Sequence, residues 1–311
     1  MTKKLVSVVV PAYNEEDCIE ELCRRLQLVF LENDAYEFEV IVIENGSTDQ
    51  TWPILKSIHH SDSRFKVLRM SRNFRMDGGI TAGINYASGD ALVVMTADLQ
   101  DPPELISSFI KKWEEGYDNI YMEVTKRSDS GPLRRLNSRL FYWLAGRMTD
   151  NRIPKNASDF RLVDRRVYET VREMNERNRF VRGLFAWVGF RSLGIPADRP
   201  PRFGGQSKAY SLQVIDLAFK GIFAHSYVPL KLITVTGLTL SVVSILSTVI
   251  LALIWIFVGV PFSGFGTIIS MIVLSFSIMM FMIGVLAEYV GLIYEEVKQR
   301  PNFVVSATLG L

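Results

Sequence analysis

Short apolar runs alternate with amphipathic segments along the first half of the chain. Five of these runs, each long enough for one buried strand, lie at residues 5–10, 38–43, 65–70, 91–95 and 119–124. Between them, residues 19–29 carry apolar positions at helical spacing on one face, and residues 78–87 form a helix candidate rich in Gly and Ala. Strands that alternate with helices at this interval predict parallel βαβ units, whose strands are buried on both faces.

The C-terminal part of the chain is far more apolar. Residues 232–287 contain no Asp, Glu, Lys or Arg, and this uncharged run is long enough for two membrane-spanning helices but not three. We expect the spans at about residues 230–257 and 267–293, joined by an uncharged connector. Basic residues flank only the outer ends of the pair, at Lys231, Lys298 and Arg300. The positive-inside rule then places both termini in the cytoplasm and the short hairpin outside.

Two segments before the spans have the pattern of helices that lie on a membrane surface. Between residues 126 and 152, seven basic and only two acidic residues are interleaved with Leu, Phe and Trp. A basic amphipathic helix with aromatic residues is typical of an anionic membrane surface, and the alternative is a solvated basic face packed on the sheet. We place this interfacial helix at residues 132–150 and a juxtamembrane amphipathic helix at residues 211–229.

Composition limits the classes of partner. The formal charge is +2, and no RNA-binding or zinc-finger pattern is present, so nucleic acid is not a favoured partner. Cys18 and Cys23 have neither redox-motif nor zinc spacing, and we expect them to be reduced packing residues. The apolar run that begins after Lys4 is ended by Pro11 and is too short for a signal peptide.

Polar residues follow three of the predicted strands at the point where each strand ends, at residues 13–15, 44–49 and 96–101. In a parallel sheet these positions meet at one edge, where open α/β folds bind ligands. The last group offers Asp98, Gln100 and Asp101. Such hard oxygen ligands suit Mg²⁺ or Mn²⁺ that holds a diphosphate, and the alternative is a polar loop without a metal.

Five ordered motifs carry a resemblance to a known family. They are Ser-Val-Val-Val-Pro-Ala-Tyr-Asn-Glu-Glu, Asn-Gly-Ser-Thr-Asp-Gln-Thr, Asn-Phe, Thr-Ala-Gly-Ile-Asn-Tyr-Ala-Ser-Gly-Asp and Ala-Asp-Leu-Gln-Asp-Pro-Pro-Glu. In this order they resemble the family 2 glycosyltransferases of the GT-A fold. Within them the chain is most similar to the polyprenyl-phosphate glycosyltransferases, the GtrB-like relatives of dolichyl-phosphate mannose synthase, over roughly residues 5–295.

The resemblance implies a role for residues in each motif. The nucleotide-binding residues would be Pro11, Tyr13, Glu15, Glu44, Asp49 and Ala97. Asp98 would hold the metal ion, and the residues that contact the sugar and the diphosphate would be Gln100, Asp101 and Arg202. The segment at residues 157–164 is similar to a second acidic motif, in which Asp159 would join Asp98 as a catalytic residue. The phosphate of the acceptor would be bound on a Gly-rich basic loop by Arg202, Ser207 and Lys208.

The chain departs from the family pattern at two places. Glu44 and Asn45 stand where the family usually has a pair of Asp residues, and Thr96 stands where it usually has the first Asp of Asp-x-Asp. The second departure leaves Asp98 as the main protein ligand of the metal. Metal affinity would then depend more on the donor diphosphate.

The expected fold is α/β, a Rossmann-like, mostly parallel GT-A sheet in a cytosolic domain at residues 1–210, with the two-helix anchor at 230–295 and a cytosolic tail at 296–311. The expected reaction is the inverting transfer of one sugar, glucose from UDP-glucose, to undecaprenyl phosphate at the cytosolic face of a bacterial inner membrane. The resemblance also implies a homotetramer. Two alternatives are a non-catalytic membrane scaffold, which the departures at Asn45 and Thr96 favour, and a processive polysaccharide synthase. The latter normally has more spans and a Gln-x-x-Arg-Trp motif, which this sequence lacks.

Overall fold

The computed structural model describes residues 3–127, 156–200 and 264–311, with scattered residues between 230 and 257. These divide into two compact units, residues 1–215 with 300–311, and residues 216–299. Three predicted segments lie outside the described residues: the interfacial helix at 132–150, the basic loop at 201–210 and the juxtamembrane helix at 211–229.

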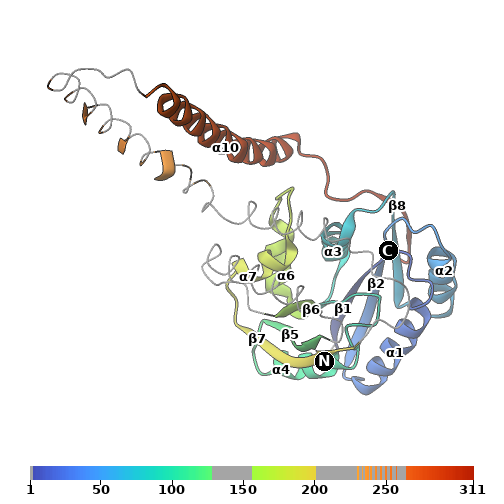
Figure 1. The fold of residues 1–311 in the computed structure, drawn as a ribbon. Helices are drawn as coiled ribbons and strands as arrows, with labels where there is room; N and C mark the ends of the chain where they lie inside the picture. Colours follow the sequence, from blue (N-terminus) through green and yellow to red (C-terminus); the bar gives the residue numbers. More distant parts are fainter. Residues whose placement is uncertain are drawn as a thin grey trace. The chain divides into compact units, whose positions relative to one another are not determined.

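An eight-stranded sheet forms the centre of the first unit, in the order β7-β5-β6-β4-β1-β2-β3-β8 (Figure 1). The five strands predicted from the sequence are present as β1 Lys4–Ala12, β2 Tyr36–Glu44, β3 Phe65–Met70, β4 Ala91–Val94 and β5 Asn119–Arg127. The sheet also contains three strands that the apolar runs did not indicate: β6 Ala157–Asp164, β7 Ser192–Arg199 and β8 Val305–Leu309.

Helices cover both faces of this sheet (Figure 1). One face packs against α1 Ile19–Glu32, α2 Thr51–Ser61 and α4 Leu105–Glu114, and the other against α3 Arg75–Tyr86, α6 Arg165–Glu173 and α7 Val181–Trp187. Successive residues of β1 belong to opposite faces, since Val8 and Val10 pack on the first side and Val9 on the second. Burial on both faces explains why this strand is continuously apolar rather than alternating.

Helix α3 lies unusually close to the sheet. A Cβ atom added to Gly83 would stand 2.2 Å from Val9 Cγ1, far inside van der Waals contact. The Gly- and Ala-rich composition of this helix therefore permits its close approach to β1, at the cost of helix propensity.

The sheet is mixed: four of its seven strand pairings are parallel and three are antiparallel, so the expected parallel core is present and antiparallel strands extend it. Strands β4, β1, β2 and β3 are parallel neighbours, but β6 runs antiparallel to both β4 and β5, and β7 is parallel to β5. As a result, the amino end of β6 and the carboxyl ends of β5 and β7 lie at the same edge as the carboxyl ends of β1, β2 and β4. We refer to this edge as the carboxyl edge.

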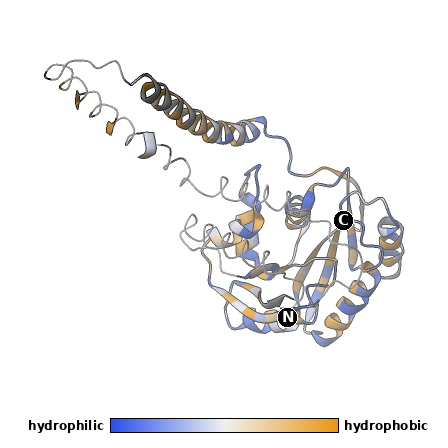
Figure 2. Cartoon of the chain, in the orientation of Figure 1, coloured by the Kyte–Doolittle hydropathy of each residue, from blue (hydrophilic) through white to orange (hydrophobic). Residues whose placement is uncertain are grey.

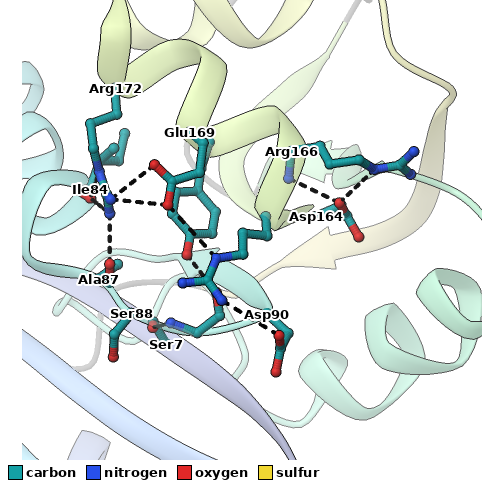
Figure 3. Close-up of polar contacts among 12 residues, drawn as sticks. Ser7, Ile84, Ala87, Ser88, Asp90, Asp164, Arg166, Glu169 and Arg172 are labelled. Atoms are coloured by element: carbon teal, nitrogen blue, oxygen red, sulfur yellow. Dashed lines mark hydrogen bonds and ion pairs between the residues drawn. The ribbon is translucent and has the colours of Figure 1, made fainter.

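Helix α6 is tied to the turn that leads from α3 into β4 (Figure 3). Arg172 donates hydrogen bonds to the carbonyl oxygens of Ile84 and Ala87, and the Tyr168 hydroxyl donates to the carbonyl oxygen of Gly89. At the start of the helix, the Asp164 carboxylate accepts the backbone N–H of Arg166 as an N-cap. These contacts fix β6 and α6 as one piece beside β4.

The segment predicted as a tail at residues 296–311 instead returns to the sheet. Strand β8 pairs antiparallel with β3, Ser71 N donates to the carbonyl oxygen of Val304 at 2.9 Å, and Asn302 donates to the carbonyl oxygen of Glu176 at 3.0 Å. Since β8 covers the backbone of β3, the C-terminal residues are a structural part of the first unit.

The second unit contains α10 Phe265–Lys298, a helix of 34 residues. Within it, Leu274–Lys298 is long and apolar enough to cross a membrane, with a mean hydropathy of 2.0, and Figure 2 shows hydrophobic residues along this helix. This is one candidate span among the described residues. The first predicted span at residues 230–257 is described only in part, and a second span is not shown.

Removing side chains that anchor β8 tests its role in the first unit. Phe303 and Leu309 pack on opposite core clusters, so Phe303→Ala and Leu309→Ala should each lower the free energy of unfolding by about 1–2 kcal/mol and accelerate hydrogen exchange in β3. Thr308→Ala is the matched control, because Thr308 is exposed; its effect should stay within about 0.5 kcal/mol. If hydrogen exchange in β3 were as slow in Phe303→Ala and Leu309→Ala as in Thr308→Ala, β8 would not be a structural requirement.

Candidate functional site

The loops after β1 and β2 are joined to each other at the carboxyl edge. The backbone N–H of Asn14 donates to Ser47 Oγ at 3.0 Å, and Thr48 N–H donates to Asn14 Oδ1 at 2.8 Å. Glu15 N–H donates to Thr51 Oγ1 at 2.9 Å. Asn14 has a φ of +53°, in the left-handed region that Asn tolerates better than most residues. The first two motifs therefore form one continuous wall, as the parallel pairing of their strands predicts.

Glu44 is fully buried at the base of this wall. Its carboxylate accepts the backbone N–H of Ser47 and the guanidinium of Arg69, whose Nε lies at 3.1 Å. Asp49 similarly accepts Thr51 N–H at 3.0 Å and Glu16 N–H at 3.3 Å. Both carboxylates thus shape the loop that would face a nucleotide.

Asn45 has a structural role that an Asp could not fill. Its Nδ2 donates to the carbonyl oxygen of Arg75 at 2.9 Å, while its Oδ1 accepts the N–H of Phe74 at 2.9 Å. A carboxylate could accept from Phe74 but could not donate to Arg75. The amide at this position therefore attaches the end of β2 to the first turn of α3.

Thr96 links two carboxylates at the end of β4. Its hydroxyl lies 2.7 Å from Asp98 Oδ1 and 2.7 Å from Asp101 Oδ2, and its backbone N–H donates to Asp101 Oδ2 at 3.0 Å. A hydroxyl has one proton, so it donates to one of the two carboxylates at a time. Leu99, between them, has a φ of +57°, so this turn is held in a conformation that a Leu rarely adopts.

Asp101 connects three strands of the sheet. It is 0% exposed, and besides Thr96 on the β4 side it lies 3.5 Å from Ser158 Oγ in β6 and 3.5 Å from Arg199 Nη2 in β7. Burial raises the pKa of its carboxyl, against the opposing effects of Arg199 and Thr96. In this arrangement Asp101 faces protein groups, and its predicted contact with the sugar or diphosphate stays a prediction.

Asp159 lies next to Ser158 and is partly exposed. Arg182, in α7, binds both of its oxygens, with Nε 2.8 Å from Oδ1 and Nη2 2.5 Å from Oδ2. Burial alone would raise the pKa of Asp159, but Arg182, with smaller contributions from Arg161 and Arg199, outweighs burial, and the pKa lies below its ordinary value. The carboxylate is therefore ionised at neutral pH.

Arg182 and Arg199 are site residues to which the sequence analysis gave no role. Arg182 is 23 residues beyond Asp159 and Arg199 is 98 residues beyond Asp101, so no local spacing connects each arginine to its partner. The partners of these arginines are set by the positions of α7 and β7.

Within the described residues, no group of three or more His, Cys, Asp or Glu side chains could hold a metal ion. Asp98 is nevertheless 6% exposed at the carboxyl edge. Mg²⁺ is commonly bound by one or two carboxylates together with substrate phosphates. A metal ion at Asp98 would therefore have to be completed by a diphosphate, since the described residues do not form an all-protein metal site.

The structure brings most of the predicted site residues to the carboxyl edge or its loops. This set comprises Pro11, Tyr13, Glu15, Glu44, Asp49, Ala97, Asp98, Gln100, Asp101 and Asp159. The predicted phosphate contacts lie outside the described residues: Arg202, Ser207 and Lys208.

The chain matches one family and proteins of similar length. The family described as Glycosyl transferase family 2 matches residues 7–172. An uncharacterized glycosyltransferase of Synechocystis sp. is 41% identical over 308 residues, covering 98% of this chain and 96% of that protein. The SfII prophage-derived bactoprenol glucosyl transferase of Shigella flexneri is 35% identical over 300 residues, covering 96% and 97%. Among solved structures, glucosyl-3-phosphoglycerate synthase from Mycobacterium tuberculosis gives a TM-score of 0.48 at 18% identity, covering 72% of this chain and 80% of that chain.

Asp77 provides a pH test of the neighbouring helix. Its Oδ1 accepts the N–H of Val181, at the start of α7, at 3.0 Å. Burial raises the pKa of Asp77 to about 6, and Asp159 adds a smaller contribution in the same direction. The hydrogen bond from Val181 and the charges of Arg182 and Arg179 oppose this rise. Because the folded-state pKa exceeds the unfolded value of 3.8, the folded protein holds the extra proton, and stability falls as pH rises from about 4 to about 6. Asp77→Asn keeps the acceptor and removes the charge.

We expect Asp77→Asn to raise the free energy of unfolding relative to wild type by about 1–3 kcal/mol at pH 7.5 and by much less at pH 4.5. Thermal unfolding of both proteins at the two pH values measures this difference. The same difference at both pH values would contradict the assignment.

Proposed function

The chain belongs to glycosyl transferase family 2 and is a glycosyltransferase, and from this premise we propose that it transfers one glucose residue from UDP-glucose to a polyprenyl phosphate. The observation that carries the proposal is the position of Asp98, in the loop after β4, and Asp159, near the amino end of β6, at one sheet edge, where Asp101 and Ser158 connect them. The relative from Shigella flexneri, named a bactoprenol glucosyl transferase, supports the class of acceptor and the sugar.

The acceptor needs little activation. A phosphate monoester has a second pKa near 6, so the acceptor is largely a dianion at neutral pH and is already nucleophilic. One of its oxygens forms the new bond to C1 of the sugar while the bond from C1 to the diphosphate breaks, and the electron pair leaves on the diphosphate of UDP. We expect inversion at C1.

Asp159 suits a positioning role in this reaction. Arg182 holds its pKa below the ordinary value, and a carboxylate with a low pKa is a weak base. Asp159 would therefore orient the acceptor, or take a residual proton from it, rather than drive proton removal.

On the donor side, Asp98, and Gln100 beside it, would hold Mg²⁺ or Mn²⁺ against the diphosphate. When bound, the ion would stabilise the negative charge of the departing UDP by Lewis acidity. Pro11, Tyr13, Glu15 and Ala97 would contact the nucleotide, and Glu44 and Asp49 would contribute by shaping its loop.

The path of the chain supports a two-span anchor. Strands β1–β7 precede the apolar region and β8 follows it, yet all eight strands belong to one sheet. Because a sheet cannot be divided by a membrane, the chain must cross the bilayer an even number of times between β7 and β8. If α10 spans the membrane, a second crossing lies within residues 201–264. Both termini and the sheet would then be cytosolic, in a bacterial inner membrane, as the positive-inside rule predicts.

The reaction is tested with the full chain purified in detergent, UDP-glucose, Mn²⁺ and a short polyprenyl phosphate. We expect a charged glucolipid, with a panel of UDP- and GDP-sugars identifying the preferred donor. Asp98→Asn should lower turnover by at least about 100-fold while thermal unfolding stays close to wild type, because the amide oxygen can still accept from Thr96. Removal of divalent ions with a chelator should have a comparable effect.

The matched control is Asp62→Asn, since Asp62 pairs with Arg64 on the α2 to β3 connection, away from the carboxyl edge. It should retain wild-type turnover. Near-normal activity of Asp98→Asn would remove the metal role, and no product with any donor would favour a non-catalytic scaffold.

Topology is tested by single introduced cysteines. The two native cysteines are buried and form no disulfide, and burial raises the pKa of Cys23 to about 12, so we expect their background reactivity to be low. In intact cells, a membrane-impermeant maleimide should label Ser263→Cys but should label Leu311→Cys only after permeabilisation. Labelling of both from the same side would contradict the two-span arrangement.

A further inference from the structure

A cavity of about 380 Å³ lies between α7 and strands β5, β6 and β7. Its walls include Asn119, Tyr121, Arg161, Arg182, Trp187 and Phe190. None of the nucleotide or metal residues proposed above lines it. It is nevertheless adjacent to Asp159, because Arg182 binds the Asp159 carboxylate and Arg161 follows Asp159 on the same face of β6.

Arg161 is a buried cation in the wall of this cavity. It is 3% exposed, and its guanidinium donates to two backbone carbonyl oxygens, those of Ser158 at 2.9 Å and Asp159 at 3.3 Å. Among the residues that the structure describes, no carboxylate forms an ion pair with it. Burial lowers its pKa to about 10, against an opposing effect of Asp159, so the guanidinium stays protonated at neutral pH.

The charge of this buried guanidinium is compensated only in part, by the nearby Asp159 carboxylate and by the Phe185 ring, whose centre lies 5.1 Å from the Arg161 Cζ. Carbonyl oxygens satisfy some of its N–H groups but supply no compensating charge, and burial of an unpaired charge is costly. The nearest carboxylate, that of Asp159, is already bound at both oxygens by Arg182. The cavity thus presents a cation to a ligand, and an anionic ligand would complete it.

Asn119 adds a polar group to the same wall. It is 3% exposed, its Nδ2 donates to Ser192 Oγ at 3.2 Å, and its Oδ1 has no hydrogen-bond partner. Rotation of the amide by 180° would leave Nδ2 as a free donor, and Ser192 Oγ, which now donates to the carbonyl oxygen of Phe190 at 3.0 Å, would donate to Asn119 Oδ1 instead. In that orientation Asn119 and Arg161 both donate toward the enclosed space.

The remaining wall is aromatic. Tyr121, Trp187 and Phe190 line the cavity, and Trp187 is 62% exposed. The lining therefore combines donors for an anion with apolar surface that opens to solvent. A ligand with a charged head and a hydrocarbon chain matches this division better than a free anion or a sugar alone.

We propose that this cavity binds the phosphate monoester of the polyprenyl phosphate acceptor, with Arg161 as its buried cationic contact and the aromatic wall against the first isoprene unit. This assignment rests on the proposed function. Arginine is well suited to phosphate, because its N–H groups match the spacing of phosphate oxygens. Bound there, the acceptor phosphate lies beside Asp159.

The test is calorimetric titration of the full chain in detergent with three probes: farnesyl phosphate, farnesol and inorganic phosphate. Wild type should bind farnesyl phosphate more tightly than either of the others. Arg161→Gln keeps an N–H donor for the Ser158 carbonyl and removes the charge, and it should weaken farnesyl phosphate binding by at least about tenfold, the loss expected for one charge-assisted hydrogen bond. Binding of farnesol should be unchanged.

Arg172→Gln is the matched control. Arg172 also donates to buried backbone carbonyls, but it lies in α6 and pairs with Glu169. This variant should bind farnesyl phosphate as wild type does. If Arg161→Gln does not fold, Asn119→Leu tests the same wall and should weaken farnesyl phosphate binding without affecting farnesol.

Three outcomes would overturn the assignment. They are unchanged farnesyl phosphate binding in both cavity variants, equal affinity for inorganic phosphate and farnesyl phosphate, and a loss of farnesyl phosphate affinity in Arg172→Gln as large as that in Arg161→Gln.

Kinetics separate this proposal from the proposed function. If glucolipid is formed and Arg161→Gln keeps the wild-type KM for polyprenyl phosphate, only the cavity assignment fails. If binding depends on Arg161 but no donor yields a glycolipid, the proposed reaction fails and the binding site stands.

Discussion

The buried carboxylate of Asp101 is the interaction on which the carboxyl edge depends. It receives hydrogen bonds from Thr96 after β4, and it contacts Ser158 at the start of β6 and Arg199 at the end of β7. These three strands arrive in different directions and from distant parts of the sequence. A fully buried carboxylate is stable only when it is well satisfied, and loss of one partner of such a pair typically costs about 3–5 kcal/mol. Asp101 therefore fixes the distance between the loop of Asp98 and the strand of Asp159.

The two departures from the family pattern have physical reasons in the same region. Asn45 donates to the carbonyl of Arg75 while accepting from Phe74, which only an amide can do. Thr96 places a hydroxyl between Asp98 and Asp101. A third carboxylate at that position would be repelled by the other two unless a cation were bound. The Thr96 hydroxyl instead bridges the two carboxylates without adding a negative charge.

Strand β8 returns the chain to the sheet after the apolar region. Residues 300–311 belong to the first unit although the apolar helix α10 precedes them. The end of α10 is thus connected to the sheet by β8, and the other end of the apolar region is connected to it by the segment that follows β7. Because both ends of the apolar region lead to the same sheet, any membrane crossings between β7 and β8 must be even in number, and the last residues form part of the sheet.

The sequence by itself determined the parallel core, the first two motif loops and the apolar anchor region. Its strongest signals are local: an unbroken β-branched run for β1, helical spacing of apolar residues in α1, and turn residues after β2. It also grouped Asp98 and Asp159 as site residues, through motifs rather than through any pattern of spacing. The sequence patterns did not predict strands β6, β7 and β8. In β7 the side chains are only partly buried, and β8 follows a helix typical of a membrane anchor.

Only the tertiary structure decided the pairs Asp159 with Arg182 and Asp101 with Arg199, and the cavity in which Arg161 lies. Each depends on the antiparallel return of β6, which brings residues far apart in the sequence to one edge. Local sequence patterns report which face of an element is apolar, because burial has the period of the helix or the strand. They do not report which polar side chains will meet, because that is set by strand order and direction, which are properties of the whole sheet.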